Sequence, residues 1–195
     1  MSKIILASSS IYRKELLGRL IPKFDHVSPN IDESIMKKES ARDASLRLAF
    51  KKASLISEDN INAYVIGSDQ TAEFNQIHVR KPKTHEEALE QLLLLSEKVV
   101  NFYSAVCVFH KSLSIKKDLI ETVEVKYRKI TKIEAETYLK YEKPIGCLGC
   151  IKSEGLGISL LEYVKSSDPT AIVCMPLIGL SKIFSSLDIK FHASE

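Results

Sequence analysis

The chain has 195 residues, which fits one large domain or two small lobes with a shared core, and its 45% hydrophobic content is enough to fill a folded interior. Its 28 Lys and Arg against 25 Asp and Glu leave a net charge of +3, without the long like-charge block typical of nucleic-acid-binding tails. No stretch approaches the roughly 18 apolar residues of a membrane span, and the N-terminus lacks a long apolar signal region. We therefore expect a soluble cytoplasmic protein whose partner is a small molecule, rather than a nucleic acid polymer or a membrane.

The first predicted elements are a strand, a polar turn and a helix. Ile4 to Ala7 is a short apolar run, three serines follow it, and Leu16, Leu17 and Leu20 then recur at helical spacing. Such a junction points backbone N–H groups and the positive end of a helix dipole into the turn, which favours phosphate. Many α/β proteins share the pattern, so alone it does not identify a function.

A second helix is predicted over Ala41 to Ser57, with an apolar face that includes Leu48, Ala49 and Ala53. Lys52 lies beside that face, whereas Lys51 points further into solvent. A lysine in this position either extends harmlessly along the surface or reaches into a cleft.

The next predicted strand, Tyr64 to Gly67, ends at Ser68-Asp69-Gln70, so that Asp69 terminates a strand. A hairpin is predicted over Thr71 to Val79, with its turn at Asn75-Gln76.

The second half of the chain alternates helices and strands. Capping-box patterns at Thr84 and Thr131 each precede a helix, and a further helix is predicted to start at Pro176. Long strands are predicted over Val99–Phe109 and Leu119–Tyr127, which are rich in β-branched and aromatic residues. Without repeats or an evident linker, we expect one domain over residues 1–195 with an α/β fold.

The four cysteines include one Cys-x-x-Cys pair, Cys147 and Cys150, which leaves a redox or zinc site open. Zinc would need a second pair or suitably spaced histidines, and the five histidines are scattered. Ordinary reduced thiols are the simpler interpretation.

Five short polar clusters fall where predicted elements end. They are Ser8–Arg13, Asp32-Glu33, Lys52, Ser68-Asp69-Gln70 and Lys81-Pro82. Cations and serines suit phosphate oxygens, and carboxylates beside them suit a divalent metal that bridges protein and phosphate. Each cluster alone could equally be a solvated loop or turn.

The order of these clusters resembles the Maf, or septum-formation-protein, family of nucleotide pyrophosphatases over nearly the whole chain. Leu6–Leu17 resembles the family's Leu-Ala-Ser-x-Ser-Pro signature, with Ile11 in place of Pro, and Pro29–Glu33 matches its Pro-x-x-Asp-Glu. The other matching segments follow in the family's order: Arg47–Ala53, Ile66–Asp69, Lys81-Pro82, Gly149–Gly155 and Pro176-Leu177. The resemblance implies an elongated mixed β-sheet flanked by helices, similar to inosine triphosphatases, with two lobes, a cleft between them and a possible homodimer.

Three positions resemble the family branch associated with 7-methyl-GTP rather than the branch that acts on dTTP and UTP. Tyr12, Gln70 and Glu154 stand where the pyrimidine branch usually has Arg, Thr and Gln. Glu154 can accept from guanine N1–H and the exocyclic amine together, and Tyr12 can stack on the positively charged methylated base.

The resemblance implies hydrolysis of 7-methyl-GTP to 7-methyl-GMP and diphosphate, a removal of modified nucleotides. Asp69 would be the general base; Asp32, Glu33 and Asp69 would hold Mg²⁺ or Mn²⁺; and the phosphates would be bound by Ser8, Arg13, Lys52 and Lys81. Two alternatives stay open: a pyrophosphatase for dTTP, UTP or a broader set of nucleotides, and a noncatalytic nucleotide-binding protein that acts in cell division.

Overall fold

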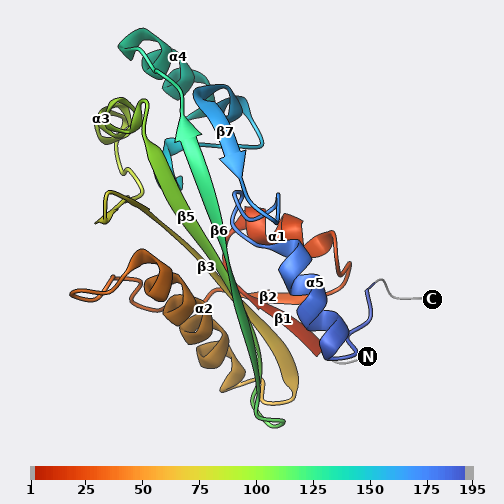
Figure 1. The fold of residues 1–195 in the computed structure, drawn as a ribbon. Helices are drawn as coiled ribbons and strands as arrows, with labels where there is room; N and C mark the ends of the chain where they lie inside the picture. Colours follow the sequence, from red (N-terminus) through yellow and green to blue (C-terminus); the bar gives the residue numbers. More distant parts are fainter. Residues whose placement is uncertain (1–2, 192–195) are drawn as a thin grey trace. The chain divides into compact units, whose positions relative to one another are not determined.

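The computed structural model describes residues 3–191, and Figure 1 shows their helices and strands. The strands are β1 (Lys3–Ala7), β2 (Asp25–Val27), β3 (Ala63–Phe74), β4 (Ile77–His78), β5 (Val99–His110), β6 (Ile115–Tyr127) and β7 (Leu161–Lys165). The α-helices are α1 (Ile11–Gly18), α2 (Ala41–Ser57), α3 (His85–Leu95), α4 (Lys132–Glu142) and α5 (Leu177–Ser186), with 3-10 turns at Leu148–Cys150 and Leu156–Leu160. Within the described residues, no helix has the length and apolar character needed to cross a membrane.

The described strands form one mixed sheet in the order β2-β1-β3-β5-β6-β7, with β4 paired to β3. β1 runs parallel to both of its neighbours, whereas β4 and β7 pair antiparallel with β3 and β6. The α/β class and the mixed sheet flanked by helices are therefore confirmed.

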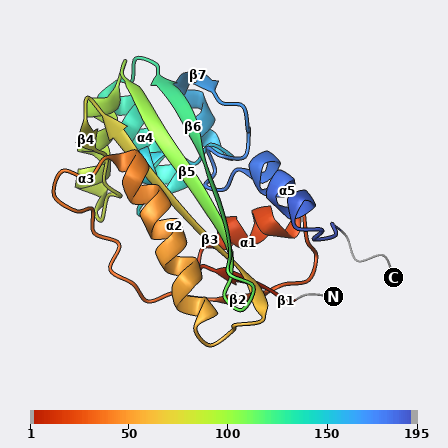
Figure 2. The same ribbon diagram turned by 60° about the horizontal axis from the view of Figure 1, so that its bottom comes forward.

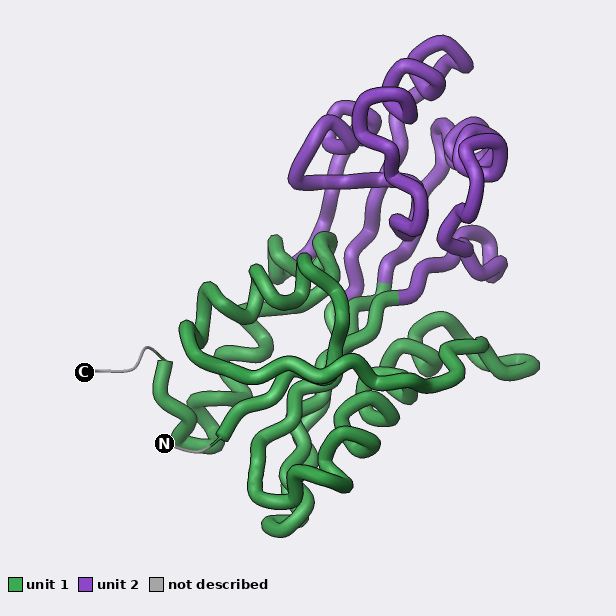
Figure 3. The backbone as a smooth tube through the Cα atoms, turned by 180° about the vertical axis from the view of Figure 1, so that it is seen from behind, with its two compact units in different colours: residues 1–70, 103–121, 167–195 green, residues 71–102, 122–166 purple. Residues whose placement is uncertain are grey.

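The chain divides into two compact units, coloured separately in Figure 3. Unit 1 contains residues 1–70, 103–121 and 167–195, and unit 2 contains residues 71–102 and 122–166. The single domain over residues 1–195 and the cleft implied by the resemblance stay predictions.

Unit 1 has helices on both faces of its strands, with α2 on one side and α1 and α5 on the other in both ribbon views (Figures 1 and 2). Side chains alternate between the two faces of a strand. Leu6 and Ile66 accordingly belong to the core formed with α1 and α5, whereas Ile5 and Val65 pack with the alanines of α2. β1 and β3 are thus packed on both faces, by the core with α1 and α5 on one face and by the core with α2 on the other.

Unit 2 is built around long strands and the helices α3 and α4. Tyr127 and Phe102 are its largest fully buried side chains, and the Tyr127 hydroxyl donates to the Gly149 carbonyl at 2.8 Å. Gly149 has φ +65°, and a Cβ there would stand 2.6 Å from that hydroxyl, so this turn needs glycine.

Several element boundaries differ from the sequence predictions. β3 does not end at Gly67 but continues through Asp69 to Phe74, so the predicted strand and the first arm of the hairpin are one strand. The turn at Asn75-Gln76 is confirmed, since both residues have positive φ and Phe74 pairs with Ile77. Pro176 is the N-cap of α5 rather than its first residue.

The two predicted capping boxes have different outcomes. At α4, Thr131 accepts from the N–H of Glu134, whose carboxylate accepts from the N–H of Thr131, so the box is complete. At α3, Thr84 caps the N–H of Glu87, but the Glu87 carboxylate accepts from the N–H of Lys83 instead.

Candidate functional site

The candidate site lies in unit 1 at the carboxyl end of β1, where the strand order reverses. From β1 the chain passes through α1 to β2 on one side, and later through α2 to β3 on the other. Ligands of open α/β sheets bind beyond the carboxyl ends of strands at such a switch point. Because Ala7 is the register partner of Gly67, Ser8 and Ser68 follow at neighbouring positions and Asp69 comes next.

The segment from Ser8 to Arg13 joins β1 to α1 and is built from short hydrogen bonds. The Ser8 hydroxyl accepts from the N–H of Ser10 at 3.1 Å, and the Ser10 hydroxyl caps the N–H of Arg13. Arg13 is buried, yet its Nε has no hydrogen-bond partner among the described residues. A buried donor without a partner costs free energy, so this guanidinium suits a site completed by an anion.

Lys52 is the centre of the charged cluster. Its ammonium is 2.6 Å from Glu33 Oε1 and 2.5 Å from Asp69 Oδ1, so one cation joins both carboxylates. The Lys52 and Asp69 side chains are only 4% and 7% exposed, whereas that of Glu33 is 50% exposed. The prediction left two orientations open for Lys52, and the structure shows that it reaches inward.

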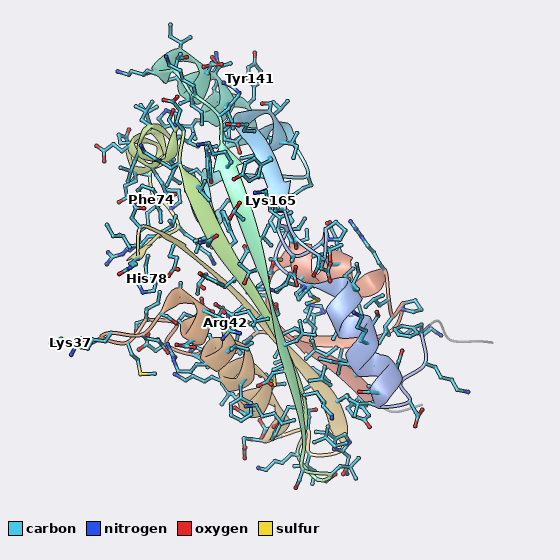
Figure 4. All side chains as sticks on the ribbon, viewed as in Figure 1. Lys37, Arg42, Phe74, His78, Tyr141 and Lys165 are labelled. Atoms are coloured by element: carbon cyan, nitrogen blue, oxygen red, sulfur yellow. The ribbon has the colours of Figure 1, made fainter. Side chains whose placement is uncertain are left out.

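Two further cations of α2 hold the loop that carries Glu33. Arg47 binds the Glu39 carboxylate through Nε at 2.5 Å and Nη2 at 2.7 Å, and Nη2 also donates to the Ser34 carbonyl. Lys51 donates to the Asp32 carbonyl at 3.3 Å. These bonds fasten the side of the loop that faces α2, whereas Figure 4 shows Lys37 of the same loop extending away from α2.

The Asp32 carboxylate is turned toward Ser34 rather than toward Lys52. The Ser34 N–H and hydroxyl donate to its two oxygens at 2.9 and 2.8 Å, and they lower the pKa of Asp32. Residues 3–191 contain no group of three or more His, Cys, Asp or Glu side chains placed to hold a metal ion. The structure therefore brings together Glu33 and Asp69 of the predicted metal ligands, without the side chain of Asp32.

The remaining predicted residues divide between the units. Tyr12 and Gln70 belong to unit 1, where Tyr12 is half-buried against the apolar core. Lys81 and Glu154 are exposed residues of unit 2. The charges of both act on the Cys147 thiol. Burial chiefly raises the pKa of this thiol, Lys152 lowers it, and the smaller effects of Glu154 and Lys81 raise and lower it respectively.

Some residues of the site were missed from the sequence. Ser104 and Asp168 are buried polar residues of unit 1. Ser104 connects Gln70 to the Ala171 carbonyl of the loop before α5, and Asp168 lies in that loop and bonds to Thr170 and to the first turn of α5. Asp168 follows a run of polar residues that reads as an ordinary loop. Ser104 lies within an apolar strand segment, and an isolated serine there was the only available signal.

Fold and site define an α/β protein in which a buried Arg13 lies just after the carboxyl end of β1 and a buried pair, Lys52 and Asp69, involves the neighbouring strand β3. A comparison with family models matches residues 3–187 to the Maf-like protein family. The chain belongs to the Maf family.

Several curated relatives are similar over nearly their full lengths and are named 7-methyl-GTP pyrophosphatase. The relative from Nitrosococcus oceani is 41% identical over 92% of this chain and 90% of its own length. Those from Burkholderia thailandensis and Xanthomonas axonopodis pv. citri are 42% and 41% identical, each over 94% of this chain and over 86% and 95% of their own lengths. Among solved structures, the Ham1 protein of Staphylococcus aureus aligns with 65% of this chain and 72% of its own at 16% identity, with a TM-score of 0.47.

Proposed function

We propose that this protein is a nucleoside triphosphate pyrophosphatase that hydrolyses 7-methyl-GTP to 7-methyl-GMP and diphosphate. The names of its relatives support this substrate, and family membership supports a nucleotide as the small-molecule partner. The observation that carries the proposal is the buried Lys52–Asp69 pair beside the Ser8–Arg13 segment. It combines cations for phosphate oxygens with a carboxylate for proton transfer.

In the proposed reaction, water attacks the α phosphorus, the bond from that phosphorus to the bridging oxygen breaks, and diphosphate leaves. Asp69 takes the proton of the attacking water. Its Oδ1 accepts a hydrogen bond from Lys52 at 2.5 Å, which orients the carboxylate and leaves Oδ2 as the oxygen that would accept the proton. Arg13 and the Ser8 segment at the start of α1 would bind phosphate oxygens.

We also propose a divalent cation, Mg²⁺ or Mn²⁺, as cofactor. Mg²⁺ is commonly bound by one or two protein carboxylates together with substrate phosphates and waters, and Glu33 and Asp69 already converge on one cation, the Lys52 ammonium. The donor set therefore fits, with Glu33 and Asp69 as ligands. When bound, the metal would neutralise charge on the phosphates.

The test is diphosphate release from 7-methyl-GTP, GTP, dTTP, UTP and CTP, with Mg²⁺ or Mn²⁺ and with chelator. Metal-dependent preference for 7-methyl-GTP is expected. Preference for dTTP or UTP would overturn the proposal of 7-methyl-GTP as substrate. Equal rates with and without chelator would overturn the proposal of a metal cofactor. No release from any nucleotide would favour a binding protein without catalysis.

A homodimer is a further part of the proposal, supported by the resemblance of the sequence to its family, and a cytoplasmic location is proposed with it. Light scattering coupled to size exclusion would measure the mass of the protein in solution. A mass near the 21.9 kDa of one chain would contradict the dimer.

A further inference from the structure

The side-chain amide of Gln70 has its hydrogens committed within the protein. Nε2 lies 3.0 Å from each of three acceptors, the Ser104 hydroxyl and the carbonyls of Ala171 and Ile172. Backbone carbonyls only accept hydrogen bonds, so the amide nitrogen of Gln70 must face them. In the flipped orientation, the amide oxygen of Gln70 would face the two carbonyl oxygens of Ala171 and Ile172 without a hydrogen between them. Ser104 donates its own hydrogen to the Ala171 carbonyl at 2.6 Å, which leaves a lone pair for Gln70.

The oxygen of this amide has a different environment. Among the described residues, the side chain of Gln70 makes only these three hydrogen bonds, all through Nε2, and Gln70 is partly exposed. The side chain therefore offers a ligand an acceptor and no donor.

The segment that holds Gln70 is itself fixed by Asp168, which is 2% exposed. Its Oδ1 accepts from the Thr170 N–H at 3.2 Å and the Thr170 hydroxyl at 2.7 Å. Its Oδ2 accepts from the N–H groups of Ile178 and Gly179 at 2.6 and 3.1 Å, in the first turn of α5. One buried carboxylate thus joins the start of the loop to the helix that ends it.

Two more hydrogen bonds close the loop over residues 168–176. The Thr170 hydroxyl accepts from the Leu177 N–H at 2.9 Å. From the strand side, the Ser68 hydroxyl donates to the Cys174 carbonyl at 3.1 Å. The loop is therefore held at both ends and in the middle, beside the strand residues that flank Asp69.

We propose that Asp168 is a positioning residue for substrate selection: by fixing the loop over residues 168–176, it holds the Gln70 amide so that Gln70 presents only a hydrogen-bond acceptor to the nucleobase. The inference rests on the proposed function, and it adds which kind of nucleobase the site selects. A base that turns an N–H donor to this position, such as the 2-amino group of guanine, is favoured. A base that turns a carbonyl to this position places its oxygen against the amide oxygen of Gln70. Neither oxygen can donate a hydrogen bond, so such a base is disfavoured.

The test compares Asp168→Asn and Asp168→Ala with Asp43→Asn, an exposed carboxylate near the start of another helix, α2. The readout is the ratio of kcat/KM for 7-methyl-GTP to that for UTP. Loss of one oriented neutral hydrogen bond predicts that the ratio falls roughly fivefold or more in the Asp168 variants and is unchanged in the control. If Asp168 had a purely structural role, its loss would lower kcat/KM for 7-methyl-GTP and for UTP by the same factor. A constant ratio of the two would therefore overturn the proposal.

Ser104→Ala provides the second variant in case the Asp168 variants do not fold. It removes one of the three acceptors of Gln70 and leaves the Asp168 bonds in place, so the ratio should shift in the same direction by a smaller factor. An unchanged ratio in a folded Ser104→Ala protein would contradict the proposal.

Binding measurements separate this inference from the proposed function. Dissociation constants for 7-methyl-GMP and UMP, measured by calorimetry, do not depend on turnover. A wild-type protein without turnover that still selects 7-methyl-GMP, and loses that selection in Asp168→Ala, would refute the catalytic proposal and support this one. Equal binding of both nucleotides by the wild type would overturn the role of Asp168.

Discussion

At the scale of single residues, Asp69 is where the proposed chemistry can be tested. Asp69→Asn keeps the shape of the side chain and an oxygen for Lys52, so the fold should persist. Loss of a general base lowers turnover by roughly 10²- to 10⁴-fold. Diphosphate release measured beside Asp59→Asn, an exposed acid that should stay active, checks this, and a folded Asp69→Asn protein with full activity would rule out the base.

Lys52 allows a stability prediction at the same scale. Removing one partner of a buried ion pair leaves a buried charge without compensation, so Lys52→Met should lower the free energy of unfolding by about 3 kcal/mol. Its neighbour Lys51 is exposed, and Lys51→Met should change stability by less than about 0.5 kcal/mol. Urea unfolding of both variants gives the comparison; equal stabilities would show that Lys52 and Asp69 are not coupled.

At the scale of elements, β3 and α2 pack without room for a side chain at Gly67. A Cβ there would lie 2.0 Å from the Ala49 carbonyl oxygen and 2.8 Å from the Ala53 nitrogen, both backbone atoms of α2. Gly67→Ala should therefore cost about 3 kcal/mol, a fall in Tm of roughly 6–12 °C. Gly18→Ala is the control, because nothing lies within 4 Å of its Cβ and alanine favours the helix.

The capping box of α4 predicts a pH effect. The Thr131 N–H, the Thr131 hydroxyl and Arg128 lower the pKa of Glu134 from 4.5 to about 2. A carboxyl with a lowered pKa stabilises the fold above its unfolded pKa, and this contribution is lost as the pH falls from about 4.5 toward 2.

The difference in Tm between wild type and Glu134→Gln should therefore be largest above pH 5 and shrink as the pH approaches 2. Glu136→Gln, on the same helix, has only a loose ion pair with Lys132 at 3.8 Å and should show little change. A difference for Glu134→Gln that does not vary with pH would contradict the assignment.

At the scale of the whole molecule, apolar periodicity and capping residues were sufficient to predict the elements that have an apolar face, such as α2. β2 was missed because its three residues are exposed and show no alternation. The sequence predicted a strand from Tyr64 to Gly67 that ends at the polar run Ser68-Asp69-Gln70, since a polar run usually ends a strand. Ser68 and Asp69 stay inside the strand because the Cys174 carbonyl and Lys52 satisfy them, and neither partner is visible locally.

The candidate site shows the same limit. The inward reach of Lys52 was one of two options that helical position allowed, whereas the bond from Gln70 to the Ala171 carbonyl joins residues 101 positions apart. Only the folded chain brings such groups together, so the role of Asp168 had no precursor in the sequence pattern.

Because each compact unit is built from several segments of the chain, dividing the protein into two fragments has a practical consequence. The turn between β5 and β6 is exposed around Leu113, and each unit draws on residues from both sides of it. Fragments 1–112 and 113–195 would each lack part of both units, so neither should be active alone. Joined to two interacting partners, such halves would form a split reporter whose diphosphate release signals their encounter.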